Sequence, residues 1–299
     1  YIKSVDRDEK NAYAIIPGVS LSKDPSKSHA FVMLFDARNH RMYYFKYPLS
    51  EFSASEDTFD IRIGKSHFGL FDVSLDIDDG RNKVSGELRF TDIHPWPVTL
   101  LSPGVMGWYA FVPRMECYHG VLSFDHDIDG GISINSMAVD FSGGKGYIEK
   151  DWGTSFPECW IWIQANNFHD HSTSFSFSVA KIPWRGHFFM GFITYLYYHG
   201  RFYLFSTYNN SSIKELSHTG DSVFISIANK TNSLRIKSTK NRTGVLKAPV
   251  EGRMSGTIRE SIDSDVSIVL YDKDDRPVYT DASRRAGIEV VDKIFEYFT

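Results

Sequence analysis

The chain has 299 residues, with 33 Lys and Arg against 37 Asp and Glu, and this formal net charge of −4 argues against a basic nucleic-acid-binding surface. Hydrophobic residues make up 42% and charged residues 23%, which excludes wholesale disorder, and two cysteines are too few for a small disulfide-stapled fold. The aromatic content of 15% favours a β-rich protein that buries large rings.

Short segments of alternating apolar and polar residues, separated by Gly, Pro, Asn and Asp, recur along the chain and predict β-strands. Asp78-Asp79-Gly80 and Asp129-Gly130-Gly131 have the composition of hairpin turns. The strands expected in the first half are residues 12–20, 29–36, 42–47, 58–63, 68–77, 84–91, 107–112, 120–126, 132–139, 146–151 and 160–166. Those expected in the second half are residues 174–179, 191–198, 202–208, 223–228, 234–238, 254–260 and 266–271, with 288–298 either a strand or a short helix.

Two consecutive runs of short strands have to close or stack to protect their edges, as antiparallel barrels and sandwiches do. We therefore predict an all-β protein made of two antiparallel β-barrel domains. The first is expected over residues 1–165, including the motif at 143–153, and the second over residues 166–299.

Membrane and export signals are weak in this sequence. The most apolar stretch, residues 188–198, is too short to span a bilayer, so we expect no transmembrane segment. The first eight residues lack the apolar core of a signal peptide, which predicts a cytoplasmic location, although the chain begins with Tyr rather than Met.

Tryptophans and carboxylates are concentrated in the middle of the chain, where residues 92–171 hold five of the six tryptophans. A carboxylic acid among aromatic rings in a dry pocket has a raised pKa and keeps its proton near pH 7. Aromatic faces also stabilise cations, so the pattern suits acid catalysis on an alkene. The alternative is that the tryptophans fill a β core while the acids cap turns or pair with Lys145 and Lys150.

Metal and cofactor motifs are incomplete. Residues 125–130 match the first half of a calcium loop, but its twelfth position would be Ser136 rather than Glu. His169 and His171 lack an identifiable third zinc ligand, and the glycines at 143–146 lack the spacing of a phosphate loop. We therefore expect no metal and no cofactor.

Residues 143–157, GGKGYIEKDWGTSFP, continued by WIWIQ at 160–164, strongly resemble the tocopherol cyclase family. FVPRMECYHG at 111–120 and AGIEVV at 286–291 resemble two further blocks of that family. The resemblance implies a calycin-like architecture of two lipocalin-like β-barrels. It also implies an isomerase-type cyclisation without a cofactor, in which an acid protonates a prenyl double bond and a quinol hydroxyl captures the cation.

Matching the acids to this chemistry makes Asp151 or Glu149 the expected proton donor, since both share one strand face with Tyr147. Glu116 and His119, from the second matching block, are further candidate catalytic residues. The rings expected to contact the substrate are those of Trp96, Trp108, Tyr147, Trp152, Trp160 and Trp162.

Other interpretations stay open from the residues alone. Glu149 and Asp151 could have a structural role, as ion pairs with Arg114 or Lys150. The protein could be a non-catalytic carrier, which needs only apolar walls and a few orienting polar groups. It could also be a structural or stress-related protein whose second barrel serves as an interaction surface. The expected partner is a hydrophobic small molecule, a prenyl quinol or another lipid, with peripheral membrane contact left open.

Overall fold

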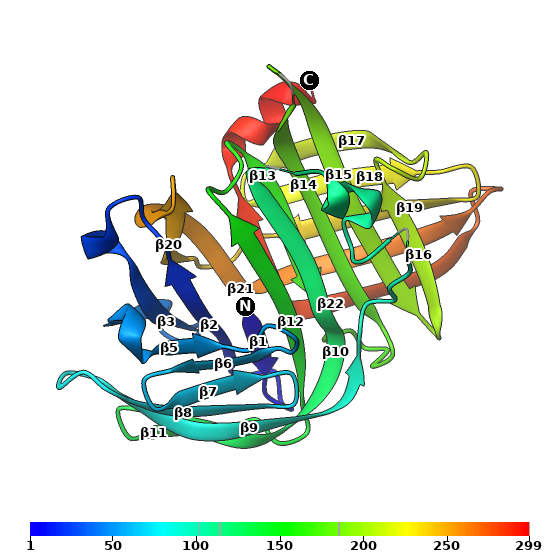
Figure 1. Cartoon of the computed structure of the whole chain (residues 1–299). Helices are drawn as coiled ribbons and strands as arrows, with labels where there is room; N and C mark the ends of the chain where they lie inside the picture. Colours follow the sequence, from blue (N-terminus) through cyan, green and yellow to red (C-terminus); the bar gives the residue numbers. More distant parts are fainter. Residues whose placement is uncertain (101, 114, 185, 299) are drawn as a thin grey trace. The chain divides into compact units, whose positions relative to one another are not determined.

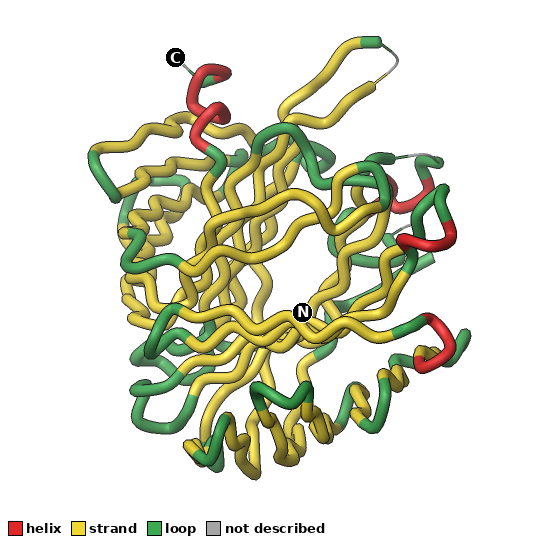
Figure 2. Tube along the Cα trace, turned by 90° about the vertical axis from the view of Figure 1, so that its left-hand side faces the viewer, coloured by secondary structure: helices red, strands yellow, loops and turns green. Residues whose placement is uncertain are grey.

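The computed structural model describes residues 1–100, 102–113, 115–184 and 186–298. Strands joined by turns make up most of these residues, as Figure 2 shows. The helical segments among them are short 3-10 helices: η1 (Pro25–Lys27), η2 (Leu49–Glu51), η3 (Gly107–Phe111) and η4 (Asp292–Tyr297). No helix in this described part of the chain is long and apolar enough to cross a lipid bilayer.

A 12-stranded sheet has the order β4-β3-β2-β1-β12-β10-β9-β8-β7-β6-β5, with β11 paired to β10 (Figure 1). Neighbouring strands such as β1 and β12 pair antiparallel. Because β3 also contacts β6, the sheet curls back toward its other end. Its strands are β1 (Ile2–Val5), β2 (Ala12–Ser20), β3 (His29–Asp36), β4 (Arg41–Tyr47), β5 (Phe52–Ala54), β6 (Asp60–Ile63), β7 (Ser66–Gly69), β8 (Asp72–Asp78), β9 (Lys83–His94), β10 (Cys117–Ile134), β11 (Met137–Asp140) and β12 (Gly144–Gly153).

A 10-stranded sheet has the order β16-β15-β14-β13-β22-β21-β19-β18-β17, with β20 paired to β21. Its apolar side chains form a second core, which includes Ile161, Ile163, Phe175 and Phe177. The strands are β13 (Trp160–Ala165), β14 (Ser174–Trp184), β15 (His187–Tyr198), β16 (Arg201–Ser206), β17 (Ser212–Thr219), β18 (Ser222–Ala228), β19 (Asn232–Thr239), β20 (Gly244–Val250), β21 (Arg253–Asp272) and β22 (Pro277–Val290).

The chain forms two compact units that alternate along the sequence. The first consists of Tyr1–Pro97, His119–Phe156 and Gly244–Thr257, and the second of Val98–Tyr118, Pro157–Thr243 and Ile258–Thr299. These bounds differ from the division at residue 165, which stays a prediction. The segment 244–257 belongs to the first unit because β20 contacts β3 and β4.

The predicted turn at residues 129–131 is wrong, because β10 runs through it as one continuous strand. The glycines there serve close backbone approach: a Cβ on Gly130 would lie 2.2 Å from the carbonyl oxygen of Glu87, and one on Gly86 would lie 2.2 Å from that of Gly131. The chain reverses later, where Asn135 and Ser136 have positive φ values of 49° and 69°. The glycine run therefore lets the strand lie close to its neighbour instead of ending it.

Several other segments differ from their predicted form, including residues 132–139, which divide between β10 and β11. The strand expected at 107–112 is η3, whose hydrogen bonds join residues three apart, such as the Val112 N–H to the Tyr109 carbonyl. Residues 68–77 divide between β7 and β8. The strands expected at 254–260 and 266–271 form one strand, β21, in which register shifts at Ser261 and Ser264 absorb the interruption.

Candidate functional site

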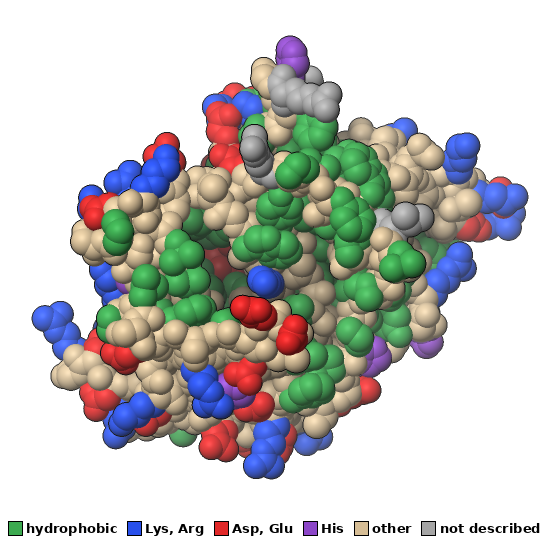
Figure 3. Space-filling model, in the orientation of Figure 1, with side chains coloured by type: hydrophobic (Ala, Val, Ile, Leu, Met, Phe, Trp, Pro, Cys, Tyr) green, Lys and Arg blue, Asp and Glu red, His purple; other side chains and the backbone are tan. Residues whose placement is uncertain are grey.

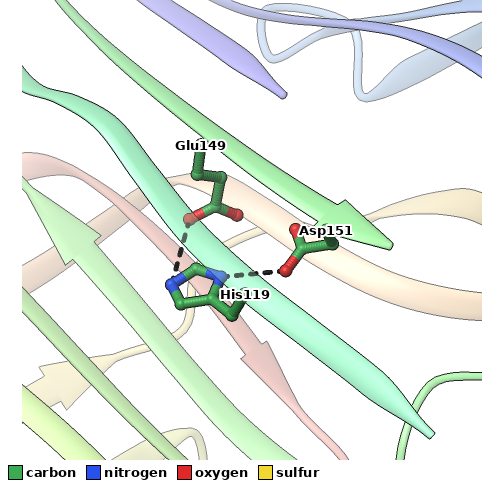
Figure 4. A group of neighbouring side chains, drawn as sticks. All are labelled: His119, Glu149 and Asp151. Carbon is green, nitrogen blue, oxygen red and sulfur yellow. Dashed lines mark hydrogen bonds and ion pairs between the residues drawn. The ribbon is translucent and has the colours of Figure 1, made fainter. Parts of the chain in front are cut away.

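His119, Glu149 and Asp151 come together on two neighbouring strands of the first unit (Figure 4). His119 lies near the start of β10, and Glu149 and Asp151 lie near the end of β12. Residues two apart in a strand point to the same face, so both carboxylates reach the imidazole from β12. We call these three residues and Tyr147 the acid cluster.

Short contacts link the members of the acid cluster. His119 Nδ1 lies 2.8 Å from Asp151 Oδ1, and His119 Nε2 lies 3.8 Å from Glu149 Oε2. The buried Tyr147 hydroxyl donates a hydrogen bond of 2.6 Å to Glu149 Oε2. The side chains of Glu149, His119 and Asp151 are 7%, 19% and 28% exposed, so Glu149 is the most shielded of the three.

Burial and neighbouring charges change the proton affinities in the acid cluster. Burial, together with the charge of Asp151, raises the pKa of Glu149 to about 7, against the lowering effects of His119 and the Tyr147 hydrogen bond. Burial alone would lower the pKa of His119, but the charges of Asp151 and Glu149 raise it to about 9. At neutral pH the cluster therefore holds an imidazolium beside a carboxylate, and a glutamic acid that retains much of its proton.

The side chains of His119, Glu149 and Asp151 could also bind a metal ion. One ligand atom from each of His119, Glu149 and Asp151 lies within 4.8 Å of the others. Histidine binds a metal through a neutral nitrogen, and the two carboxylates that raise the His119 pKa instead favour the proton on its ring. The expectation of no metal stays a prediction.

The structure also bears on the structural alternative for the two acids. Asp151 forms an ion pair with His119, a partner that the sequence interpretation did not assign to it. The Lys150 ammonium lies over the Trp152 ring, 5.0 Å from its centroid. Arg114 lies outside the described residues.

Three of the rings expected to bind substrate lie in the first unit, and they differ in burial and in the face of the sheet that they occupy. Tyr147 is fully buried within the acid cluster. Trp96 is buried, with 7% of its surface exposed. Trp152 is 46% exposed and packs against Gly120, so strand alternation puts its ring on the opposite face of the sheet from His119.

Trp108 and Glu116 belong to the second unit. Trp108 lies in η3 and is 49% exposed. Glu116 immediately precedes β10, and burial raises its pKa. Neither residue is part of the acid cluster.

Trp160 and Trp162, also in the second unit, share one face of β13. The Trp160 indole donates a hydrogen bond of 2.7 Å to the Glu289 carboxylate. The Trp162 ring covers Gly287, where a Cβ would lie 2.7 Å from the indole. Both rings therefore pack along β22, and their proposed contact with substrate stays a prediction.

Lys3 is a residue near the acid cluster that the sequence interpretation missed. It lies directly opposite Tyr147 in the β1–β12 register and is fully buried. Cross-strand partners place their side chains on the same face, about 5 Å apart. No local sequence signal marks Lys3, because 144 positions separate it from Tyr147 and the strand that carries it was not predicted.

The chain matches the model of the family described as tocopherol cyclase-like over residues 75–291. It is 26% identical over 215 residues to a protein named probable tocopherol cyclase, chloroplastic, from Oryza sativa subsp. japonica, covering 66% of this chain and 44% of that protein. The Zea mays protein named tocopherol cyclase, chloroplastic, is 26% identical over 173 residues, covering 56% and 36%. The chain thus spans less than half the length of these curated relatives.

Two solved structures share the fold. The kievitone hydratase of Nectria haematococca has a TM-score of 0.55 at 10% identity and covers 97% of this chain and 87% of its own. A protein of Nitrosomonas europaea described as AttH has a TM-score of 0.51 at 12% identity, with coverages of 96% and 90%. The predicted all-β class with lipocalin-like antiparallel barrels is confirmed.

Proposed function

We propose, because this chain belongs to the tocopherol cyclase-like family, that it catalyses the acid-promoted cyclisation of a prenylated quinol or a related isoprenoid lipid. The observation that supports the proposal most directly is the acid cluster, in which a shielded carboxyl keeps its proton beside an imidazolium–carboxylate pair. General acids work best when their pKa lies near the operating pH, because the proton is then both present and transferable.

We assign proton donation to Glu149. Its side chain is the least exposed of the cluster, and burial favours its neutral form. The Tyr147 hydroxyl and the His119 imidazolium both face Glu149 Oε2, so they stabilise the carboxylate that remains after proton transfer. Asp151 has the different role of holding His119 in its charged form.

The proposed reaction is an isomerisation whose atoms balance without a redox partner. The Glu149 proton adds to the less substituted carbon of a prenyl double bond, which leaves a tertiary cation on the adjacent carbon. The phenolic oxygen of the same molecule attacks this cation, forming a C–O bond, and the phenolic proton passes to the Glu149 carboxylate. The new carboxylate stabilises the adjacent cation until the ring closes.

The test uses a methylated hydroquinone that carries a prenyl chain, incubated with the protein in D₂O. We expect a chromanol that carries one deuterium on the carbon next to the ring-closure site. Glu149→Gln should lower kcat by roughly 100-fold or more, the usual contribution of a general acid, with little change in KM. The matched control is Glu87→Gln, at an exposed position of β9, which should behave like the wild type.

Three results would contradict the proposal. Equal turnover by the wild type and Glu149→Gln would exclude Glu149 as the donor. Saturable binding of the hydroquinone without turnover by the wild type would instead favour a carrier. Turnover lost on treatment with EDTA and restored by a divalent cation would assign the cluster to metal binding.

A further inference from the structure

The far end of the β14–β15 hairpin extends beyond its neighbouring strands in the second unit. Residues 181–184 of β14 pair with residues 187–190 of β15, whereas β13 pairs β14 only over 175–180 and β16 pairs β15 only over 193–198. Figure 2 shows these strand ends projecting as a two-stranded ribbon. At this end of the hairpin, neither edge of the ribbon is paired with β13 or β16.

Both faces of the ribbon carry exposed aromatic rings. Trp184 is 38% exposed and Phe188 is 48% exposed. Phe188 pairs with Pro183 and Trp184 pairs with His187, so strand alternation puts the two rings on opposite faces. We call the ribbon end that carries Trp184 and Phe188 the aromatic tip.

A second apolar element lies against the aromatic tip. Trp108 of η3 stacks on Tyr109 with ring centroids 4.1 Å apart, and Tyr109 stacks on Phe189 of the ribbon at 5.7 Å. Phe189 in turn meets Trp184 edge-on at 6.4 Å. Figure 3 shows hydrophobic side chains gathered over η3 and the adjoining strands. The described residues include six exposed Phe and Trp side chains, and four of them lie in these two segments: Trp108, Phe111, Trp184 and Phe188.

The same two segments are devoid of acidic residues. Residues 93–115 and residues 171–214 contain no Asp or Glu, and the longer stretch carries four Lys and Arg, although the chain as a whole has a net charge of −4. The Glu158 carboxylate contacts both Lys181, below the tip, and Lys293. Two exposed acids, Asp292 and Glu296, lie in η4, whose Tyr297 ring centroid is 5.2 Å from that of Phe188. The tip and η3 themselves carry no acid, and acid-free aromatic segments are complementary to an anionic lipid surface.

From these features we propose that the aromatic tip and Trp108 insert into the headgroup region of an anionic lipid bilayer. A protein partner would cover one face of a ribbon, whereas a narrow end that is apolar on both faces suits immersion in a medium that surrounds it. Tryptophan prefers the membrane interface because its ring combines an apolar body with a polar N–H. The proposal does not rest on the acid cluster.

The experiment measures co-flotation with large unilamellar vesicles of phosphatidylcholine alone or with about 30% phosphatidylglycerol. We expect the wild type to float with the anionic vesicles, more weakly with the neutral ones, and less at high salt because salt screens the charge attraction. The double variant Trp184→Ser/Phe188→Ser should lose roughly tenfold in partition coefficient, equivalent to about 1.4 kcal/mol. Phe71→Ser, which removes a 65% exposed ring from the first unit, should bind like the wild type.

Retained activity on the hydroquinone, or an unchanged circular dichroism spectrum and thermal midpoint, would show that the double variant is folded. Trp108→Ser provides an independent variant outside the ribbon. A wild type that floats with neither vesicle, or variants that float as well as the wild type, would overturn the proposal. If the wild type instead bound no vesicles and formed a dimer that the substitutions dissociate, the aromatic tip would be assigned to contact between copies of the chain.

Discussion

Replacing Asp151 with Asn removes the carboxylate that faces His119 at 2.8 Å while keeping the size of the side chain. Asp151 and Glu149 together raise the pKa of His119 from 6.5 to about 9. At about 1.4 kcal/mol per pKa unit, this corresponds to about 3 kcal/mol of stabilisation when His119 is charged. Asp151 supplies the largest charge effect and a hydrogen bond, so we assign it about 2 kcal/mol of that total.

The stability that Asp151→Asn loses should depend on pH in a definite direction. His119 has a higher pKa in the folded state than in the unfolded chain, so its stabilisation is complete below about pH 6.5 and disappears as the pH rises through about 9. The Asn variant should therefore be about 2 kcal/mol less stable than the wild type near pH 6, and the part of this difference that comes from the ion pair should vanish above about pH 10. At high pH, where Glu149 is ionised, the Asn variant is also free of the repulsion between residues 149 and 151. This second effect likewise makes the variant more stable relative to the wild type as the pH rises.

Urea unfolding of both proteins at about pH 6, 8 and 10 measures the effect as a difference in the free energy of unfolding. The matched control is Asp8→Asn, which removes the partner of Lys10 in an ion pair whose side chains are 64% and 75% exposed. That variant should leave the free energy of unfolding close to the wild-type value at each pH, because an ion pair this exposed contributes little to stability. A difference for Asp151→Asn that is the same at all three pH values would refute the reasoning.

Three further outcomes are expected. Turnover should fall as the pH rises through about 7, because Glu149 then loses its proton, and a pH–rate profile measures this. Tyr147→Phe removes a hydrogen bond that lowers the Glu149 pKa, so it should move this alkaline limb to higher pH; an unmoved limb would argue against Glu149 as the acid. Gly86→Ala should lower the free energy of unfolding in urea by roughly 2 kcal/mol or more, because its Cβ would lie 2.2 Å from the Gly131 carbonyl oxygen. The control Gly80→Ala should lower it by only roughly 1 kcal/mol, the strain of the positive φ at that position.

Local sequence patterns predicted most strands of this protein. Alternation placed β2, β3 and β13 within one residue of their observed ends, because strand periodicity is a property of consecutive residues. Glycine composition caused the wrong turn prediction at residues 129–131. The residues around Gly130 have turn composition, and only the position of β9 beside β10 shows that their missing side chains make room for a neighbouring backbone.

The residues of the candidate site were also predicted only in part from the sequence. The sequence alone determined that Tyr147, Glu149 and Asp151 share a strand face, since their spacing is two, and its resemblance to a family identified His119 as a candidate acid–base group. Only the tertiary structure decided that His119 meets both carboxylates, that Trp152 lies on the opposite face, and that Lys3 lies beside Tyr147. Strand periodicity is a property of neighbouring residues in the chain. The contacts of β12 instead join residues far apart in the sequence, 32 positions for His119 and Asp151 and 144 for Lys3 and Tyr147, so no local pattern predicts them.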